Sequence, residues 1–157
     1  MTPLQARYVH TNLVARDWLR LVEFYVQVFG CQPVPPERHL EDHWVEQATG
    51  VPGAAINGMH LRLPGYGDSG PTLEIFQYNY LQGGESPAIN RPGLTHLAFA
   101  MEDVPAALAA VLAAGGRQVG ELVHVHVEGA GRLAFVYASD PEGNLLELQK
   151  WEQHLDG

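Results

Sequence analysis

The sequence predicts an α+β protein built from two copies of one module, each a strand, a helix and about three further strands. Three observations carry this prediction. An aspartate lies seven residues after His10 and again after His96. An apolar run at helical spacing follows each aspartate and ends at a glycine, twenty residues after the histidine. Each half then closes with a carboxylate inside an apolar strand, at Glu74 and at Glu147.

In the first half, residues 8–15 form a strand whose alternation places Tyr8, His10, Asn12 and Val14 on one face. Asp17 caps the next helix, because its carboxylate can accept from free amides of the first turn. Gly30 suits the end of that helix. The strands that follow are expected at residues 59–63 and 72–78, with a weaker early strand near residues 31–35 or 44–48.

The second half repeats this order. A strand at residues 94–101 precedes Asp103, the equivalent helix cap, and the helix carries an apolar stripe of Leu108, Val111 and Leu112. Asp140 opens a turn that joins the last two strands. The strands of this half are expected at residues 122–127, 132–138 and 144–150.

The chain of 157 residues is expected to form one domain over residues 1–157. Its first module spans about residues 6–80, its linker residues 81–92, and its second module about residues 93–152. The first module has a longer connection between its histidine and its glutamate, which falls mostly in residues 35–57. Such an insertion is either a lid or binding loop, or a surface elaboration.

Charge and composition exclude several kinds of partner. A formal charge of −9 with nine lysines and arginines argues against nucleic acid and against anionic membranes. We find neither a signal peptide nor the roughly 20 apolar residues of a membrane helix. Cys31 is the single cysteine, so no internal disulfide forms. We therefore expect a cytoplasmic protein with a small-molecule substrate.

The histidines and glutamates of the repeat predict a metal site. Strand alternation turns Glu74 and Glu147 away from their apolar neighbours, and a buried carboxylate needs a cation or a proton. Two imidazoles with two carboxylates suit Zn, Ni, Co, Mn or Fe. The alternative is that each glutamate simply faces solvent. His124 and His126 share one face of a strand. The candidate roles for this pair are pocket lining, a second metal pair, or side chains that simply face solvent.

Five segments resemble the vicinal oxygen chelate superfamily (glyoxalase, bleomycin resistance and dioxygenase proteins), and most closely its glyoxalase I-like members. The five segments are His10–Asp17, Phe24–Gly30, Thr72–Tyr78, Gly93–Phe99 and Phe135–Leu148. The resemblance implies paired βαβββ modules that form a cup around one divalent metal ion.

In that family, the positions of His10, Glu74, His96 and Glu147 hold the metal. The resemblance implies a lactoylglutathione lyase-like lyase or isomerase, in which a ligand glutamate moves a proton next to a carbonyl of a metal-chelated substrate. Glu147 is the first candidate for this catalytic base and Glu74 the second. Related two-module chains commonly form homodimers.

The resemblance does not name the substrate. Glyoxalase I proteins usually carry an asparagine for glutathione where this chain has Tyr78. The residues that we expect to bind the substrate are Asn12, Trp44, Tyr78, Arg91 and His126. The alternatives are a methylmalonyl-CoA-type epimerase, an extradiol Fe(II) dioxygenase, or a non-catalytic protein that sequesters a drug or metabolite.

Overall fold

The computed structural model describes residues 1–152 and divides the chain into two compact units. The first unit is Met1–Gly83, and the second begins at Gly84. Within the described residues, no helix is both long and apolar enough to cross a membrane. The mixed α+β composition, with strands in two sheets, agrees with the predicted fold class.

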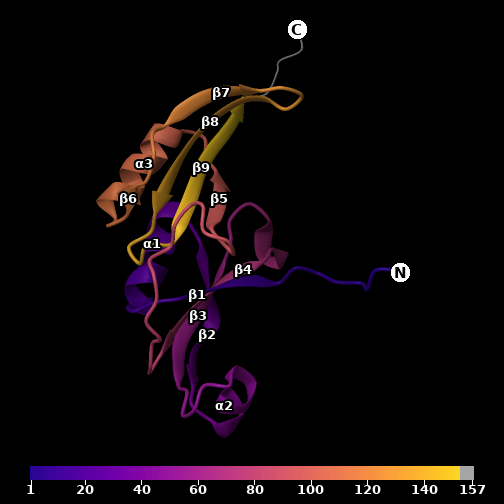
Figure 1. Ribbon diagram of the computed structural model, residues 1–157, viewed down its shortest axis with the longest axis vertical. Helices are drawn as coiled ribbons and strands as arrows, with labels where there is room; N and C mark the ends of the chain where they lie inside the picture. The colour runs from indigo at the N-terminus through magenta and orange to yellow at the C-terminus, as the bar shows by residue number, and fades with distance from the viewer. Residues whose placement is uncertain (153–157) are drawn as a thin grey trace. The chain divides into compact units, whose positions relative to one another are not determined.

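The first unit contains a four-stranded sheet in the order β1-β4-β3-β2 (Figure 1). β1 runs parallel to β4, whereas β4 with β3 and β3 with β2 are antiparallel. The strands are β1 (His10–Val14), β2 (Gln32–Leu40), β3 (Ile56–Arg62) and β4 (Thr72–Tyr78). A short 3₁₀ turn, η1 (Gly67–Ser69), lies between β3 and β4.

Helix α1 (Trp18–Phe29) begins and ends as the sequence predicts. The Asp17 carboxylate accepts from the backbone amide of Arg20 at 3.1 Å, and Gly30 closes the helix with a left-handed φ of 68°. The apolar face of α1 is buried and packs on β3 and β4. Only one face of this sheet is thereby covered by α1, and its other face is free to carry polar side chains.

The insertion at residues 35–57 is partly strand and partly helix. β2 starts at Gln32, in agreement with the expected strand near 31–35, and its pairing with β3 is interrupted around Pro35 and Pro36, which have no amide hydrogen to donate. The alternative strand at 44–48 was wrong, because these residues lie in α2 (His43–Thr49). Val45 of α2 is buried against Ala54 and Ile56.

The second unit contains the strand order β5-β9-β8-β6, with β7 also paired to β8. β5 is parallel to β9, and the remaining pairs are antiparallel. The strands are β5 (His96–Ala100), β6 (Arg117–Gln118), β7 (Val123–Val127), β8 (Gly131–Ser139) and β9 (Leu145–Glu152). β6 and β7 share one edge of β8, at its two ends, and the two-residue β6 had no counterpart in the sequence prediction.

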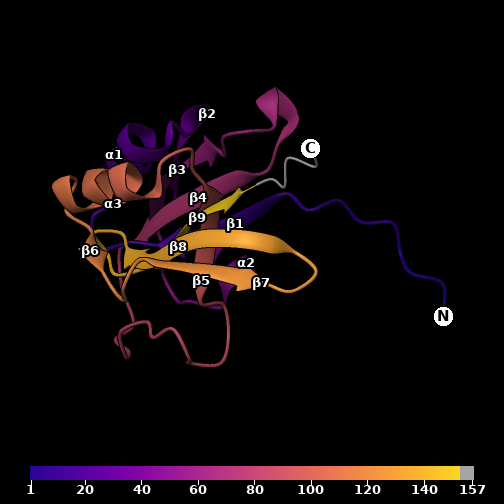
Figure 2. The same ribbon diagram turned by 90° about the horizontal axis from the view of Figure 1, so that it is seen from above.

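Helix α3 (Val104–Ala113) packs on β8 and β9, and Figure 2 shows it lying along one face of these strands. The Asp103 carboxylate accepts from the amide of Ala106 at 2.9 Å, as predicted for a cap. The expected apolar stripe needs correction. Val104, Ala107 and Val111 are buried, whereas Leu112 is 44% exposed, since it lies one position beyond the face that meets the sheet.

The two units repeat the same register between strand and strand. His10 lies opposite Thr72 and Asn12 opposite Glu74 in the first unit. His96 lies opposite Leu145 and Ala98 opposite Glu147 in the second. In each unit the glutamate therefore pairs with the residue two positions after the histidine. The duplication read from the sequence extends to the hydrogen-bonded register.

We expect Asp103→Ala to lower the free energy of unfolding by about 1 kcal/mol, because the first turn of α3 loses a side-chain acceptor. Asp103→Ser, which restores a capping oxygen, should recover most of this loss. Urea unfolding of the three proteins measures the difference. Equal stabilities of the wild type and Asp103→Ala would show that the cap contributes nothing.

Candidate metal centre

The first histidine–glutamate pair lies on the sheet face of the first unit that α1 leaves uncovered. Leu73 and Ile75 have no exposed surface and point into the α1 side, so strand alternation turns Glu74 to the opposite face. His10 on the adjacent parallel strand presents its Nε2 atom 3.6 Å from Glu74 Oε1. The pair predicted from the sequence is thus brought together within one unit.

Two further residues hold the Glu74 carboxylate. The Asn12 amide donates to Glu74 Oε1 at 2.9 Å. His60 Nε2 lies 2.7 Å from Glu74 Oε2, and both side chains are about nine-tenths buried, with 14% and 13% exposed. Each oxygen of Glu74 therefore has its own close partner, and the carboxylate is held in one orientation.

His60 is itself fixed from both sides. Its Nδ1 atom is hydrogen-bonded to Thr72 Oγ1 at 2.8 Å, and its ring meets the His10 ring edge to face at 5.4 Å. Burial lowers the pKa of His60 below its usual range, while the charge of Glu74 opposes this shift.

The second histidine–glutamate pair repeats the first in its own unit. His96 Nε2 lies 3.5 Å from Glu147 Oε2. Leu146 and Leu148 are fully buried beside Glu147, as their counterparts are in the first unit. The side chain of Gln149 donates to Glu147 Oε2 at a longer distance of 3.4 Å.

The two pairs differ in what stands across the hairpin from the glutamate. His60 is the register partner of Glu74, whereas Tyr137 is the register partner of Glu147. The Tyr137 ring contacts the His96 ring at 5.2 Å. Glu74 thus has close nitrogen partners on both oxygens, and Glu147 is held less tightly.

His60 had no predicted role. The signal was nevertheless available in the expected strands at 59–63 and 72–78, which are joined by the turn-rich residues 64–71. Residue 60 lies across from residue 74 when this hairpin is centred on residue 67. The register depends on the length of that turn, which has no sequence repeat to support it. His60 lies in the longer first module, and its counterpart in the second is an aromatic residue, so comparing the halves did not find it.

Both pairs fit the chemistry of a divalent ion. Two atoms that bind one ion at about 2.0–2.2 Å lie about 3–4 Å from each other, and the pairs at 3.6 and 3.5 Å match this spacing. In the first unit the ligand atoms of His10, His60 and Glu74 all lie within 4.8 Å of one another, so three donors could hold an ion there. Nitrogen and carboxylate oxygen donors are those that Zn, Mn, Fe, Co and Ni accept.

Of the expected substrate-binding residues in the first unit, Asn12 contacts Glu74, whereas Tyr78 and Trp44 lie toward or on α2. Tyr78 is on the same face of β4 as Glu74, but it packs against the small cluster around Val45 beneath α2. Trp44 on α2 is 50% exposed. Asn79 follows Tyr78, the position where glyoxalase I proteins usually carry an asparagine for glutathione. Its side chain is hydrogen-bonded to the backbone of Ala55 and Gly53.

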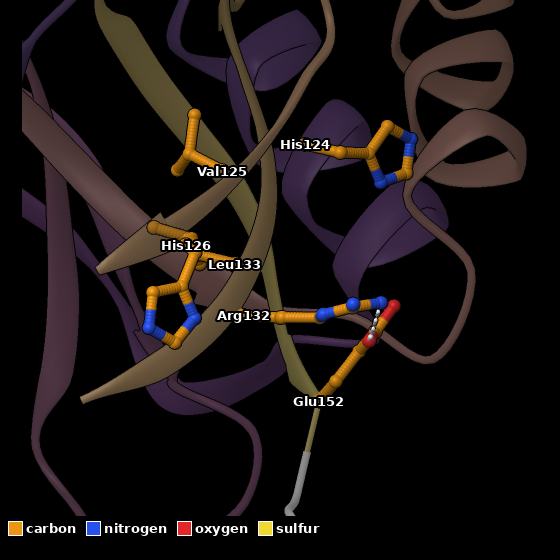
Figure 3. A pocket seen from close by; sticks show the side chains of 6 residues that line it. All are labelled: His124, Val125, His126, Arg132, Leu133 and Glu152. Carbon is orange, nitrogen blue, oxygen red and sulfur yellow. Dashed lines mark ion pairs between the residues drawn. The ribbon is translucent and has the colours of Figure 1, made fainter. Parts of the chain in front are cut away.

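The expected substrate-binding residues of the second unit are not brought to Glu147. Arg91 forms an ion pair with Glu85 at 3.0 Å, within its own loop. His126 lies in one cross-strand row with Arg132 and Glu152, and alternation places this row on the face of the sheet opposite Glu147. Figure 3 shows a pocket with the Arg132–Glu152 ion pair at 4.0 Å, lined by His124, Val125, His126, Arg132, Leu133 and Glu152.

A protein-family profile and a named relative both match most of the chain. The sequence profile of the Glyoxalase/Bleomycin resistance protein/Dioxygenase superfamily matches residues 7–148. A protein of Vibrio parahaemolyticus named probable lactoylglutathione lyase is 28% identical over 96% of this chain and 95% of its own length.

Solved structures share the fold. A glyoxalase family protein from Bacillus cereus has a TM-score of 0.79 at 18% identity, covering 96% of this chain and 97% of its own. The fosfomycin resistance protein FosX of Listeria monocytogenes, solved with Mn(II) and sulfate, has a TM-score of 0.56 at 14% identity, covering 96% and 95%. At these identities the likeness concerns the fold alone.

Because His60 orients Glu74, we expect His60→Gln to weaken the binding of a divalent ion by roughly 10–100-fold. His39→Gln is the matched control, since His39 is exposed in the same unit and pairs with Glu37. Competition of Zn²⁺ or Mn²⁺ between each protein and a chromophoric chelator measures the affinity. An unchanged affinity in His60→Gln would remove His60 from the site.

Cys31 should not react as a nucleophile. Burial raises the pKa of its thiol to about 11, so that almost none is thiolate near neutral pH. We expect alkylation by iodoacetamide at pH 8 to be at least about 100-fold slower in the folded protein than in urea. Mass spectrometry over time measures both rates, and comparable rates would contradict the buried position.

Proposed function

Because the chain belongs to the glyoxalase/bleomycin resistance protein/dioxygenase superfamily, we propose that it is a divalent-metal-dependent lyase or isomerase of glyoxalase type. Its reaction moves a proton on the carbon next to a carbonyl of a small-molecule substrate. His10, Glu74, His96 and Glu147 would hold one divalent ion per chain, of Ni, Zn, Co, Mn or Fe. A homodimer in the cytoplasm forms part of the same proposal.

The observation that carries this proposal is the repetition of one histidine–glutamate pair. Each pair stands at equivalent positions of neighbouring parallel strands, and each has a nitrogen-to-oxygen distance near 3.5 Å. Each glutamate is largely buried, with 13% of its side chain exposed, which would be costly for a carboxylate without a cation or donors beside it. Solvent-facing glutamates would not be buried to this extent.

The different surroundings of the two glutamates support different roles for them. Glu74 is held by Asn12 and His60, which suits a ligand that stays in place. The longer contacts of Glu147 leave its carboxylate freer to accept a proton from the substrate and to return it. When bound, a divalent cation supplies a Lewis acid that stabilises negative charge developing on the substrate oxygens.

One observation favours a second candidate, an Fe(II) dioxygenase. His10, His60 and Glu74 form a set of two histidines and one carboxylate within the first unit. Non-haem iron oxygenases use such a set because it leaves positions open for substrate and oxygen. In this alternative, His60 is a metal ligand rather than the residue that orients Glu74.

Substituting the two glutamates separately tests the proposal. We expect Glu147→Gln to retain most of the metal and to lose at least about 100-fold in kcat, because the base is removed. Glu74→Gln should lose the metal itself. Metal content by mass spectrometry and turnover of a methylglyoxal–thiol hemithioacetal, methylmalonyl-CoA and a catechol are measured on the same samples.

The matched control is Glu121→Gln, an exposed position that should change neither quantity. Turnover of the catechol with oxygen uptake, dependent on His60, would favour the dioxygenase. Full activity of Glu147→Gln on every substrate would contradict the assignment of the base. No bound metal in the wild type under any loading condition would end the metalloenzyme proposal.

A further inference from the structure

A cavity of about 370 Å³ lies in the second unit, where its sheet meets the connection that leads into β5. The sheet contributes Arg117 from β6, Ser139 from the end of β8 and Leu145 from the start of β9. Residues 86–89 of the connection also line it. The volume falls within the range of roughly 300–1,000 Å³ that is typical of small-molecule pockets. Of the described residues that line this cavity, none belongs to the proposed metal site.

Arg117 and Ser139 are neighbours in one row across the sheet. Arg117 is the register partner of Ser139, and Ser139 is the register partner of Leu145. Row partners project from the same face of a sheet, so the guanidinium and the hydroxyl approach the cavity from one side. The row ends at His96, which is three strand spacings, or about 14 Å, from Arg117. Arg117 is therefore well separated from the histidine–glutamate pair of this unit.

The charge of Arg117 is available to a ligand. Its side chain is exposed, and within residues 1–152 it has neither an ion pair nor a hydrogen bond. The other arginines of this unit differ, since Arg91 pairs with Glu85 and Arg132 with Glu152. A guanidinium carries a planar fork of donors that matches the two oxygens of a carboxylate. Arg117 thus offers this unit a cation for an external anion.

Ser139 adds a hydroxyl without a partner next to this cation. Only 4% of the residue is exposed, and in the part of the chain that the structure describes its Oγ atom has no hydrogen-bond partner. A buried hydroxyl that makes no hydrogen bond is destabilising. A ligand oxygen in the cavity would satisfy this hydroxyl after a rotation about the Cα–Cβ bond of Ser139.

The remaining side chains of the lining restrict the class of ligand. Ile89, Val119 and Leu145 give the cavity an apolar part. Glu142 is the carboxylate among the lining residues, beside the one guanidinium of Arg117. Because the positive charge is a single one, it matches one carboxylate group, whereas a dianion such as phosphate would be left with uncompensated charge near Glu142.

We propose that this cavity binds a small monocarboxylic acid with a short hydrocarbon chain. The Arg117 guanidinium donates to both carboxylate oxygens, and the Ser139 hydroxyl donates to one of them. The hydrocarbon chain contacts the apolar side chains of Ile89, Val119 and Leu145. The inference does not rest on the proposed function, because the cavity shares no residue with the proposed metal site.

Butyrate tests the proposal, with inorganic phosphate at pH 8 as the dianion and 1-butanol as the uncharged chain. In ¹⁵N-labelled full-length protein, we expect butyrate to shift the backbone amide signals of Ser139 and Gly143, which both line the cavity. Butyrate should bind at least about 10-fold more tightly than phosphate or 1-butanol. The affinity for butyrate should be the same with and without added Zn²⁺, so a failure of metal binding would overturn the proposed function and leave this inference standing.

Substitutions of arginine provide a matched pair of variants. Arg117→Gln should weaken butyrate binding at least about 10-fold, and Arg117→Lys, which keeps the charge without the fork, should have an intermediate affinity. Arg132→Gln is the control, because Arg132 belongs to the same unit and lies outside this cavity, and it should leave butyrate binding unchanged.

Ser139→Ala separates a role in binding from a role in folding. Because the hydroxyl has no partner in the described part of the chain, its removal should not lower Tm, and it should weaken butyrate binding about threefold or more. A lower Tm with unchanged butyrate binding would contradict the role of Ser139. Absence of butyrate shifts at Ser139 and Gly143, tighter binding of phosphate, or equal losses in Arg117→Gln and Arg132→Gln would overturn the inference.

Discussion

Parallel pairing of β1 with β4, and of β5 with β9, is the constraint from which the candidate site follows. In each pair the histidine begins one strand and the glutamate lies two rows further along its neighbour. The leucine and isoleucine residues on either side of the glutamate are buried against the helix, so strand alternation places the glutamate on the opposite face of the sheet. A shift of one residue in either register would turn the histidine and the glutamate to opposite faces.

The duplication explains which parts of the structure could be predicted from the sequence. Features that occur in both halves could be predicted because each copy supports the other. They are the histidines, the helix caps, and the sheet face of the glutamate in the Leu-Glu-Ile and Leu-Glu-Leu strands. Features that occur once were missed or misplaced. α2 lies in the insertion, where one of two expected strands proved to be helix. His60 depends on the register of one hairpin, and its counterpart in the second unit is Tyr137.

The two halves of the repeat differ in what surrounds each glutamate. In the first unit, His60 and Asn12 surround the carboxylate of Glu74, and arginines share its sheet face. In the second, Glu147 lies across from Tyr137, and its carboxylate has longer contacts with His96 and Gln149. In the function that we propose, these surroundings suit a metal ligand at Glu74 and a proton acceptor at Glu147. Membership in a superfamily with several reactions agrees with a duplicated unit in which the histidines and glutamates repeat while their neighbours differ.

The metal content of two double variants tests whether one ion is shared by both halves of the repeat, as we propose. We expect His96→Ala with Glu147→Gln, and His10→Ala with Glu74→Gln, each to lose the ion, because the proposed site takes ligands from both halves. Retention of one ion per chain in the His96→Ala and Glu147→Gln protein would contradict this claim. It would show that His10, His60 and Glu74 of the first unit are sufficient to hold the ion.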